Sequence, residues 1–325
     1  MHQQLYPFKF EPILKNKIWG GSKLKNLFGK KSASSNLGES WELSGQPTDA
    51  SIVTNGFLAG NNLNELIEVY MDELLGHEVY SAFGNNFPLL FKFIDANQDL
   101  SIQVHPNDEL AAKRHGGFGK TEMWYVVDAH KQAELIIGFK NDCTKEAYVQ
   151  AIADGTVEAL LQRIPVSKGD VFFIPAGLIH AIGKGVVVAE IQQNSDLTYR
   201  LYDYKRVDDT GQERELHTEL AVDAIHFNAS PNPKTNYKTK LNDIAKLIKC
   251  SYFTTNLLEF DSVSIRNYGQ IDSFVVYMCI EGNFVIKTND TKLIVYKGDT
   301  VLVPACINEV ELIPEHECRL LEVYV

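Results

Sequence analysis

Three polar side chains alternate with apolar ones in the run SIQVHP at residues 101–106. Residues two apart on a strand share a face, so Ser101, Gln103 and His105 point one way while Ile102 and Val104 point the other. An imidazole and an amide on one face of an apolar strand are typical of half of a metal site.

Two further candidate ligands follow along the chain. Glu122 opens the strand-like stretch at 122–127, and His180 ends a turn after the apolar run at 171–174. Taken singly, His105 could end a strand, and His180 could be a core residue bonded to a carbonyl. A carboxylate on an otherwise apolar strand is costly, however, unless a cation compensates it. We therefore expect Gln103, His105, Glu122 and His180 to bind one metal ion.

This ligand set offers two imidazole nitrogens and two oxygens, one from a carboxylate and one from an amide. It suits Zn²⁺ and is open to Fe²⁺, Mn²⁺ or Co²⁺. With one anionic ligand the site keeps a formal charge of about +1, which favours polarising a carbonyl or stabilising an enediolate at an open coordination position.

These residues lie in motifs that closely resemble those of the type I phosphomannose isomerases, a cupin-fold family. The matching motifs are IWGG at 18–21, SIQVHP at 101–106, KTE at 120–122, IPAGLIHAIG at 174–183, EIQQNSDLTYR at 190–200, YDY at 202–204 and RELH at 214–217. The resemblance covers most of the first 230 residues. It implies interconversion of mannose 6-phosphate and fructose 6-phosphate, with one Zn²⁺ per chain held by Gln103, His105, Glu122 and His180. It also implies that Lys120, Asp196 and Arg200 serve proton transfer and substrate binding.

The chain departs from many family members in two respects. It has Lys120-Thr121-Glu122 where they have Lys-Pro-Glu, and only 57 residues lie between Glu122 and His180, which leaves no room for their helical insertion. The resemblance is therefore to the short bacterial branch, and any phosphate contact made by the insertion must be supplied differently.

Aldose–ketose isomerisation moves a proton between C1 and C2 through an enediol, so the pocket needs a proton shuttle. Asp196, Lys120 and a water molecule are the candidates, and the sequence does not rank them. Arg200 offers a planar fork for a phosphate or a pair of sugar hydroxyls, although an Asp196–Arg200 surface ion pair is an alternative. Ser101 is expected to hydrogen-bond the substrate or cap a strand, and Trp19 to wall the pocket or fill a core.

The composition is that of an ordinary globular protein of 325 residues with a net charge of −11. A phosphorylated substrate must therefore be attracted by local cations, namely Lys120 and Arg200, with Lys113 or Arg114 as further candidates. The acidic balance argues against nucleic acid. The absence of a signal-like amino terminus or a long apolar stretch argues against a membrane, and five scattered cysteines fit reduced thiols, so we expect a cytoplasmic protein.

The element pattern predicts a mainly β protein, a bicupin of two jelly-roll β-barrels with helical decoration at 63–83, 144–161 and 215–227. We place a catalytic cupin domain at 1–230 and a degenerate one at 231–325, divided at a proline-rich linker. SKGDVFFIPA at 167–176 returns as YKGDTVLVPA at 296–305, which aligns His180 with Glu309 and indicates a second barrel without a metal site.

Two other functions remain open on the sequence. Two histidines and a carboxylate also describe a non-haem iron dioxygenase, and a bicupin can bind sugar without turnover. Gln103 as a fourth protein ligand disfavours the first, and Lys120, Asp196 and Arg200 disfavour the second. We expect a monomer or a homodimer.

Overall fold

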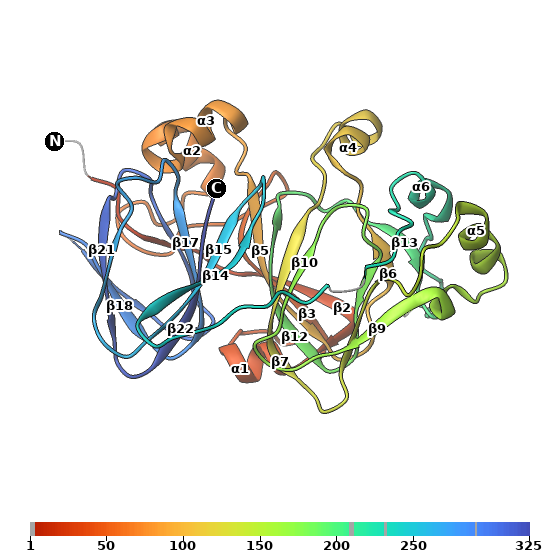
Figure 1. Cartoon of the computed structure of the whole chain (residues 1–325). Coiled ribbons are helices and arrows are strands. Elements are labelled where there is room, and N and C mark those ends of the chain that lie inside the picture. Colours follow the sequence, from red (N-terminus) through yellow and green to blue (C-terminus); the bar gives the residue numbers. More distant parts are fainter. Residues whose placement is uncertain (1–3, 208–210, 231–232, 290) are drawn as a thin grey trace.

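Two β-barrels lie side by side in the computed structural model, which describes residues 4–207, 211–230, 233–289 and 291–325 (Figure 1). Within these residues each barrel consists of two antiparallel sheets. This arrangement confirms the mainly β, two-barrel prediction.

The first barrel has a seven-stranded and a five-stranded sheet. The larger consists of β2 (Ile13–Gly21), β3 (Leu37–Gln46), β4 (Asp49–Ala50), β5 (Leu89–Ala96), β7 (Glu122–Ala129), β10 (Val171–Ile174) and β12 (Val186–Gln193). The smaller consists of β6 (Ile102–Val104), β8 (Glu134–Phe139), β9 (Leu161–Pro165), β11 (His180–Ile182) and β13 (Tyr199–Tyr202).

The second barrel has a six-stranded and a four-stranded sheet. The larger consists of β1 (Phe8–Lys9), β14 (Asp243–Lys249), β15 (Thr254–Phe260), β17 (Val275–Glu281), β20 (Thr300–Val303) and β22 (Cys318–Tyr324). The smaller consists of β16 (Ser264–Asn267), β18 (Phe284–Lys287), β19 (Lys292–Val295) and β21 (Glu309–Pro314). The amino-terminal strand β1 pairs with β20 and so belongs to this barrel.

The two larger sheets pack back to back, which explains why their strands are apolar on both faces. On β7, Trp124 and Val126 point into the first barrel, while Met123 and Tyr125 join a core shared with the second barrel. On β17, Met278 points into that shared core in the same way. The strand period of two thus builds a barrel interior and an interface from one sequence run.

The helices cover the ends and outer faces of the barrels. They are α1 (Lys23–Phe28), α2 (Leu63–Leu75), α3 (His77–Phe83), α4 (Asp108–His115), α5 (Lys145–Ala153) and α6 (Thr218–Val222), with a 3₁₀ helix at Val157–Leu160. The expected helix at 63–83 is two helices, because Gly76 has φ 93° and ends the first of them. Those expected at 144–161 and 215–227 are shorter than predicted, and α1 and α4 were not predicted. None of the helices in the described ranges is long and apolar enough to cross a bilayer.

Strand pairing places the ligand positions of the first barrel against counterparts in the second. Glu122 pairs with Ile174 and Val275 with Val303, whereas Gln103 pairs with His180 and Asn267 with Glu309. Asn267, Gly269, Val275 and Glu309 therefore stand where Gln103, His105, Glu122 and His180 stand in the first barrel. Only the latter group supplies a cluster able to hold a metal among the described residues.

The second barrel instead fills its interior with a polar network around Glu322. This carboxylate accepts two hydrogen bonds from Arg266, both at 3.0 Å, one from Tyr268 Oη at 2.6 Å and one from Asn256 Nδ2 at 3.0 Å. The network leaves Glu322 fully paired, so this interior is a structural element rather than a ligand site.

Candidate metal centre and active site

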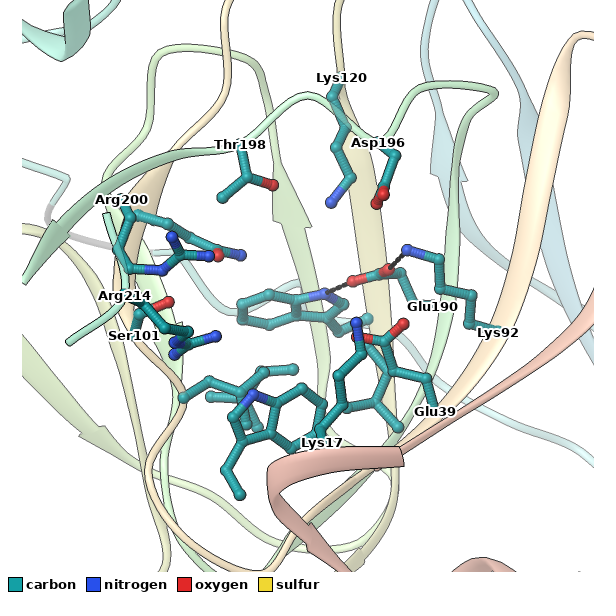
Figure 2. Close-up of a pocket in the computed structure, with 16 residues that line it drawn as sticks. Lys17, Glu39, Lys92, Ser101, Lys120, Glu190, Asp196, Thr198, Arg200 and Arg214 are labelled. Carbon is teal, nitrogen blue, oxygen red and sulfur yellow. Dashed lines mark hydrogen bonds and ion pairs between the residues drawn. The ribbon is translucent and has the colours of Figure 1, made fainter. Parts of the chain in front are cut away.

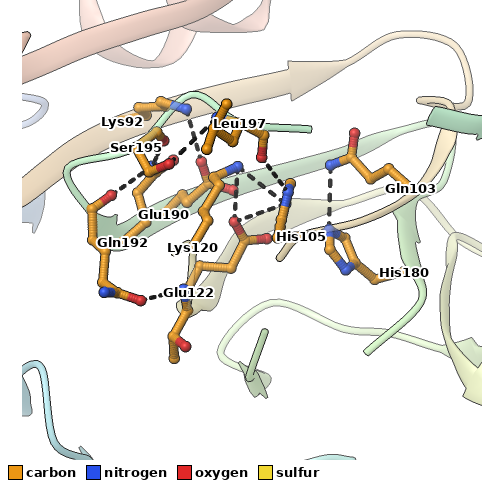
Figure 3. A network of polar contacts seen from close by, with 12 residues as sticks. Lys92, Gln103, His105, Lys120, Glu122, His180, Glu190, Gln192, Ser195 and Leu197 are labelled. Carbon is orange, nitrogen blue, oxygen red and sulfur yellow. Dashed lines mark hydrogen bonds and ion pairs between the residues drawn. The ribbon is translucent and has the colours of Figure 1, made fainter. Parts of the chain in front are cut away.

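Two histidines and a glutamate meet inside the first barrel. Glu122 is the first residue of β7, His180 the first of β11, and His105 follows β6 directly. Their ligand atoms lie within 4.8 Å of one another, and all three residues are buried. Nε2 of His105 and Nε2 of His180 each lie 3.5 Å from an oxygen of Glu122 (Figure 3).

Backbone carbonyls fix the tautomer of both imidazoles. Nδ1 of His105 donates to the carbonyl of Leu197, and Nδ1 of His180 donates to that of Leu178, both at 2.8 Å. A carbonyl can only accept, so Nδ1 carries the hydrogen and the Nε2 lone pairs face Glu122. Burial, with the nearby charge of Lys120, lowers the pKa of His105 to about 3, and burial lowers that of His180. Both rings are thus held in the neutral form that a metal requires.

Glu122 is an ionised carboxylate whose charged neighbour is Lys120. Burial alone would raise its pKa, but the charge of Lys120, whose Nζ lies 3.0 Å from Oε2, holds the pKa well below its ordinary value. A buried carboxylate aimed at two imidazole lone pairs is an arrangement that a divalent cation completes. The residues therefore fit the expected metal.

Gln103 lies beside this group, with its side-chain amide 3.2 Å from Nε2 of His180. The nitrogen of the amide faces the imidazole, and turning the amide by 180° presents its oxygen at the same place. Gln103 is thus positioned to be the fourth ligand.

A cavity of about 240 Å³ opens next to the candidate metal centre. Its wall consists of Lys17, Trp19, Glu39, Lys92, Ile94, Leu100, Ser101, Gln103, Lys120, Trp124, Ile182, Glu190, Asp196, Thr198, Arg200 and Arg214. Figure 2 shows Lys120 and Asp196 together on one side, Arg200, Arg214 and Ser101 on another, and Lys92, Glu190 and Glu39 opposite them. The structure thus brings Trp19, Ser101, Lys120, Asp196 and Arg200 to one cavity.

The side chains of Lys120 and Asp196 are the titratable groups nearest the expected reaction. Nζ of Lys120 lies 3.2 Å from Nε2 of His105. Burial would lower the pKa of this lysine, but the charges of Glu122, Glu190 and Asp196 outweigh burial and raise it. Lys120 is therefore a cation at the edge of the candidate metal centre.

The Arg200 side of the cavity has more positive charge than its carboxylate partners balance. Arg214 donates two hydrogen bonds to Asp203, both at 2.7 Å, whereas Nη1 of Arg200 donates only to the carbonyl of Glu215, at 2.9 Å. Nε of Arg200 is buried and has no partner among the described residues. Burial and the charge of Arg214 lower the pKa of Arg200. This is the effect expected where two cations lie close together and no anion is bound between them.

The other expected cations lie elsewhere. Lys113 and Arg114 are on α4, outside the cavity, and Arg114 pairs with Asp223 after α6. Asp196 and Arg200 were alternatively expected to form a surface ion pair. No such ion pair is present among the described residues, and Arg200 donates a hydrogen bond to the backbone carbonyl of Glu215 instead.

Several cavity residues escaped the sequence analysis. Nζ of Lys92 lies 3.2 Å from Oε1 of Glu190, whose Oε2 accepts a hydrogen bond of 2.8 Å from Trp124 Nε1. Lys92 and Glu190 pair across β5 and β12, the most completely buried strands of the barrel. A charged residue inside each of two continuous apolar runs was the signal that could have revealed them. Thr198 and Arg214 lie in the quoted motifs at 190–200 and 214–217 but were given no role there, and Lys17 and Glu39 had no comparable signal.

Known proteins resemble this chain over most of its length. The family model for the phosphomannose isomerase type I catalytic domain matches residues 7–148, and the model for the mannose-6-phosphate isomerase cupin domain matches residues 243–325. The mannose-6-phosphate isomerase ManA of Bacillus subtilis (strain 168) is 39% identical, and the alignment covers 96% of this chain and 97% of that protein. The mannose-6-phosphate isomerase of Streptococcus mutans serotype c is 36% identical over 96% of this chain and 99% of that one.

A solved structure shows the same architecture over the same length. The crystal structure of the mannose 6-phosphate isomerase from Bacillus subtilis superposes with a TM-score of 0.88 at 34% identity, covering 99% of this chain and 100% of that one. With two family models in chain order and relatives aligned from end to end, the chain belongs to the type I phosphomannose isomerase family.

Proposed function

We propose that this protein is a metal-dependent aldose–ketose isomerase that interconverts mannose 6-phosphate and fructose 6-phosphate through an enediol. The observation that carries the proposal is the buried His105–Glu122–His180 group, whose ionised carboxylate and tautomer-fixed imidazoles border a charged cavity. Relatives named mannose-6-phosphate isomerase over nearly the full length support the same reaction.

The metal proposed is Zn²⁺, one ion per chain, held by His105, Glu122, His180 and the amide oxygen of Gln103. Two imidazoles and two oxygens suit zinc, with other divalent ions able to substitute. Such an ion, when bound, supplies Lewis-acid polarisation of the sugar carbonyl.

Lys120 and Asp196 are proposed to handle the proton that moves between C1 and C2. Their side chains lie together on one side of the cavity (Figure 2), and Nζ of Lys120 is 3.2 Å from Nε2 of His105. The carboxylate can accept the proton from one carbon, which makes it a neutral carboxylic acid, and return it to the other carbon while the ammonium group beside it keeps its charge. Ser101 and Trp19 line the same cavity, where the hydroxyl is placed to hydrogen-bond the sugar and the indole to exclude water.

The phosphate is proposed to bind at Arg200, with Arg214 beside it. The cavity wall carries five cations, Lys17, Lys92, Lys120, Arg200 and Arg214, against three carboxylates, Glu39, Glu190 and Asp196. This local excess offsets a chain charge of −11, which would otherwise repel a phosphorylated sugar.

Two other functions are separated from this one by a single assay series. Purified protein is incubated with mannose 6-phosphate with and without oxygen, and fructose 6-phosphate is measured. The proposal predicts equal product in both. Oxygen consumption without fructose 6-phosphate indicates a dioxygenase, and saturable binding with neither oxygen consumption nor fructose 6-phosphate indicates a sugar-binding bicupin.

Three further assignments stay proposals. The domain division at residue 230 is supported by the two barrels, except that β1 adds to the sheet of the second. Five free cysteines support a reducing, cytoplasmic location. A monomer or a homodimer remains our expectation.

A further inference from the structure

The described residues of the second barrel include no metal-binding set, yet one side chain of this barrel reaches towards the candidate active site. The turn between β14 and β15 lies at the junction of the two barrels (Figure 1) and carries Tyr252. The ring of Tyr252 packs against the core that the barrels share, and its hydroxyl donates a hydrogen bond of 2.6 Å to Oδ2 of Asp108.

Asp108 uses its other oxygen to hold the segment before Lys120. Oδ1 accepts hydrogen bonds from the amide of Gly119 at 2.8 Å and from Nε2 of Gln193 at 3.0 Å. Asp108 is also the first residue of α4, where an acidic side chain commonly stabilises the helix. That helix already has an N-cap, because Asn107 Oδ1 accepts from the amide of Leu110 at 2.9 Å. The three hydrogen bonds to Asp108 therefore exceed what the helix needs.

Gln193 extends the connection to the far side of Lys120. The side-chain Oε1 of Gln193 accepts a hydrogen bond from the backbone amide of Thr121 at 2.8 Å. The backbone amide of Gln193 donates to the carbonyl of Thr121 at 3.1 Å. The amide of Lys120 donates to the carbonyl of Pro106 at 3.1 Å. Three consecutive amides, at residues 119 to 121, are thus each held by a named acceptor.

The backbone around Gly119 leaves no space for a side chain. A Cβ atom at this position would lie 2.6 Å from the amide nitrogen of Asp108, closer than such atoms approach in folded proteins. Residue 119 is therefore glycine because Asp108 and the Lys120 segment are in direct contact.

Asp108 and Tyr252 keep the protonation states that their hydrogen bond requires. Burial would raise the pKa of Asp108, but its hydrogen bonds, that from Tyr252 foremost, hold the pKa below its ordinary value. Burial and the hydrogen bond to Asp108 raise the pKa of Tyr252 to about 12. The aspartate stays an acceptor and the tyrosine a donor across the neutral range.

We propose that Tyr252 is a positioning residue for Lys120: acting through Asp108 and Gln193, the second barrel fixes the backbone that aims the lysine at His105 and Glu122. The proposal rests on the isomerase function above, in which Lys120 takes part. It assigns to the second barrel a role in the reaction that takes place in the first barrel.

Tyr252→Phe removes one hydroxyl and keeps the packed ring. We expect kcat for mannose 6-phosphate to fall by about 10- to 100-fold, the scale of a misplaced catalytic group. KM should stay within about threefold, because Tyr252 does not line the cavity. Tyr6→Phe is the matched control: Tyr6 does not line the cavity, and its Oη donates to the carbonyl of Asn55 at 2.8 Å and accepts from the amide of Leu58 at 2.9 Å, so its loss should reduce stability and leave kcat unchanged.

Amide hydrogen exchange tests the connection without relying on turnover. In metal-free protein, Tyr252→Phe should speed exchange at Gly119 and Thr121 by about tenfold or more, while Tyr6→Phe leaves these amides protected. Asp108→Asn keeps the size of the side chain but weakens the acceptor. The double variant should resemble Asp108→Asn alone in both readouts, because the two residues act in series.

The outcomes separate the two proposals. Active parent protein with kcat unchanged in Tyr252→Phe, or exchange unchanged at both amides, overturns the positioning role. A parent protein that turns over no mannose 6-phosphate overturns the proposed function instead, and the exchange measurement still decides whether Tyr252 holds the Lys120 segment.

Discussion

Arg200→Ala should abolish most turnover and leave the metal in place. Nη1 of Arg200 is occupied by the carbonyl of Glu215, whereas Nε and Nη2, which form one edge of the guanidinium group, donate to no described protein atom. One free edge is what a bidentate contact with phosphate needs.

The size of the effect follows from those two donors. A hydrogen bond to a charged group contributes about 1.5–3 kcal/mol, so two contribute about 3–6 kcal/mol. At about 1.4 kcal/mol for each factor of ten, kcat/KM for mannose 6-phosphate should fall by about 10²- to 10⁴-fold. Arg200→Lys keeps a charge without the fork and should give an intermediate loss.

The assay measures initial rates of fructose 6-phosphate formation together with bound metal per chain. Arg163→Ala is the matched control, since Arg163 on β9 pairs with Glu158 at 2.7 Å and lies outside this cavity. It should change kcat/KM by less than about twofold. The reasoning is refuted if Arg200→Ala retains kcat/KM within about threefold of the parent, or if it loses its metal.

Three further expectations follow from the geometry. His105→Ala and His180→Ala should each lose both bound metal and activity, as judged by metal analysis and rate; full metal retention in both would overturn the ligand assignment. Burial lowers the pKa of His105 from 6.5 to about 3. Between these two pH values His105 is protonated in the unfolded chain and neutral in the folded chain. His105 should therefore lower the free energy of unfolding of the metal-free protein by about 1.4 kcal/mol for each pH unit as the pH drops from 6.5 towards 3, as measured by urea unfolding. A free energy of unfolding that does not change with pH over this range would contradict this expectation. Glu322→Gln leaves Arg266 without its buried partner and should cost about 3–5 kcal/mol of unfolding free energy, while bound metal per folded chain stays the same; lost metal would place a ligand in the second barrel.

Much of the metal centre was predictable because it is encoded locally. The alternation of Ser101, Gln103 and His105 with apolar neighbours requires only that residues 101–105 be extended. The repeated run at 167–176 and 296–305 then fixed which position of the second barrel matches His180. Strand pairing across that repeat gives the same register.

The rest depends on contacts between distant segments. Arg214 enters the cavity from beyond β13, and Tyr252 reaches Asp108 across 144 residues. Periodicity reveals which face of an element is buried, but not which partner a polar side chain finds there. The short β1 illustrates the same limit, because its pairing with β20 spans almost the whole chain.

The central claim is that the group formed by His105, Glu122 and His180 holds a metal that isomerisation requires. The most direct test measures fructose 6-phosphate formation from mannose 6-phosphate by purified protein as isolated, after chelation, and during stepwise return of Zn²⁺. We predict that activity disappears with chelation and returns in proportion to bound zinc, reaching its full value at one ion per chain. Full activity in protein shown to be free of metal would contradict the claim.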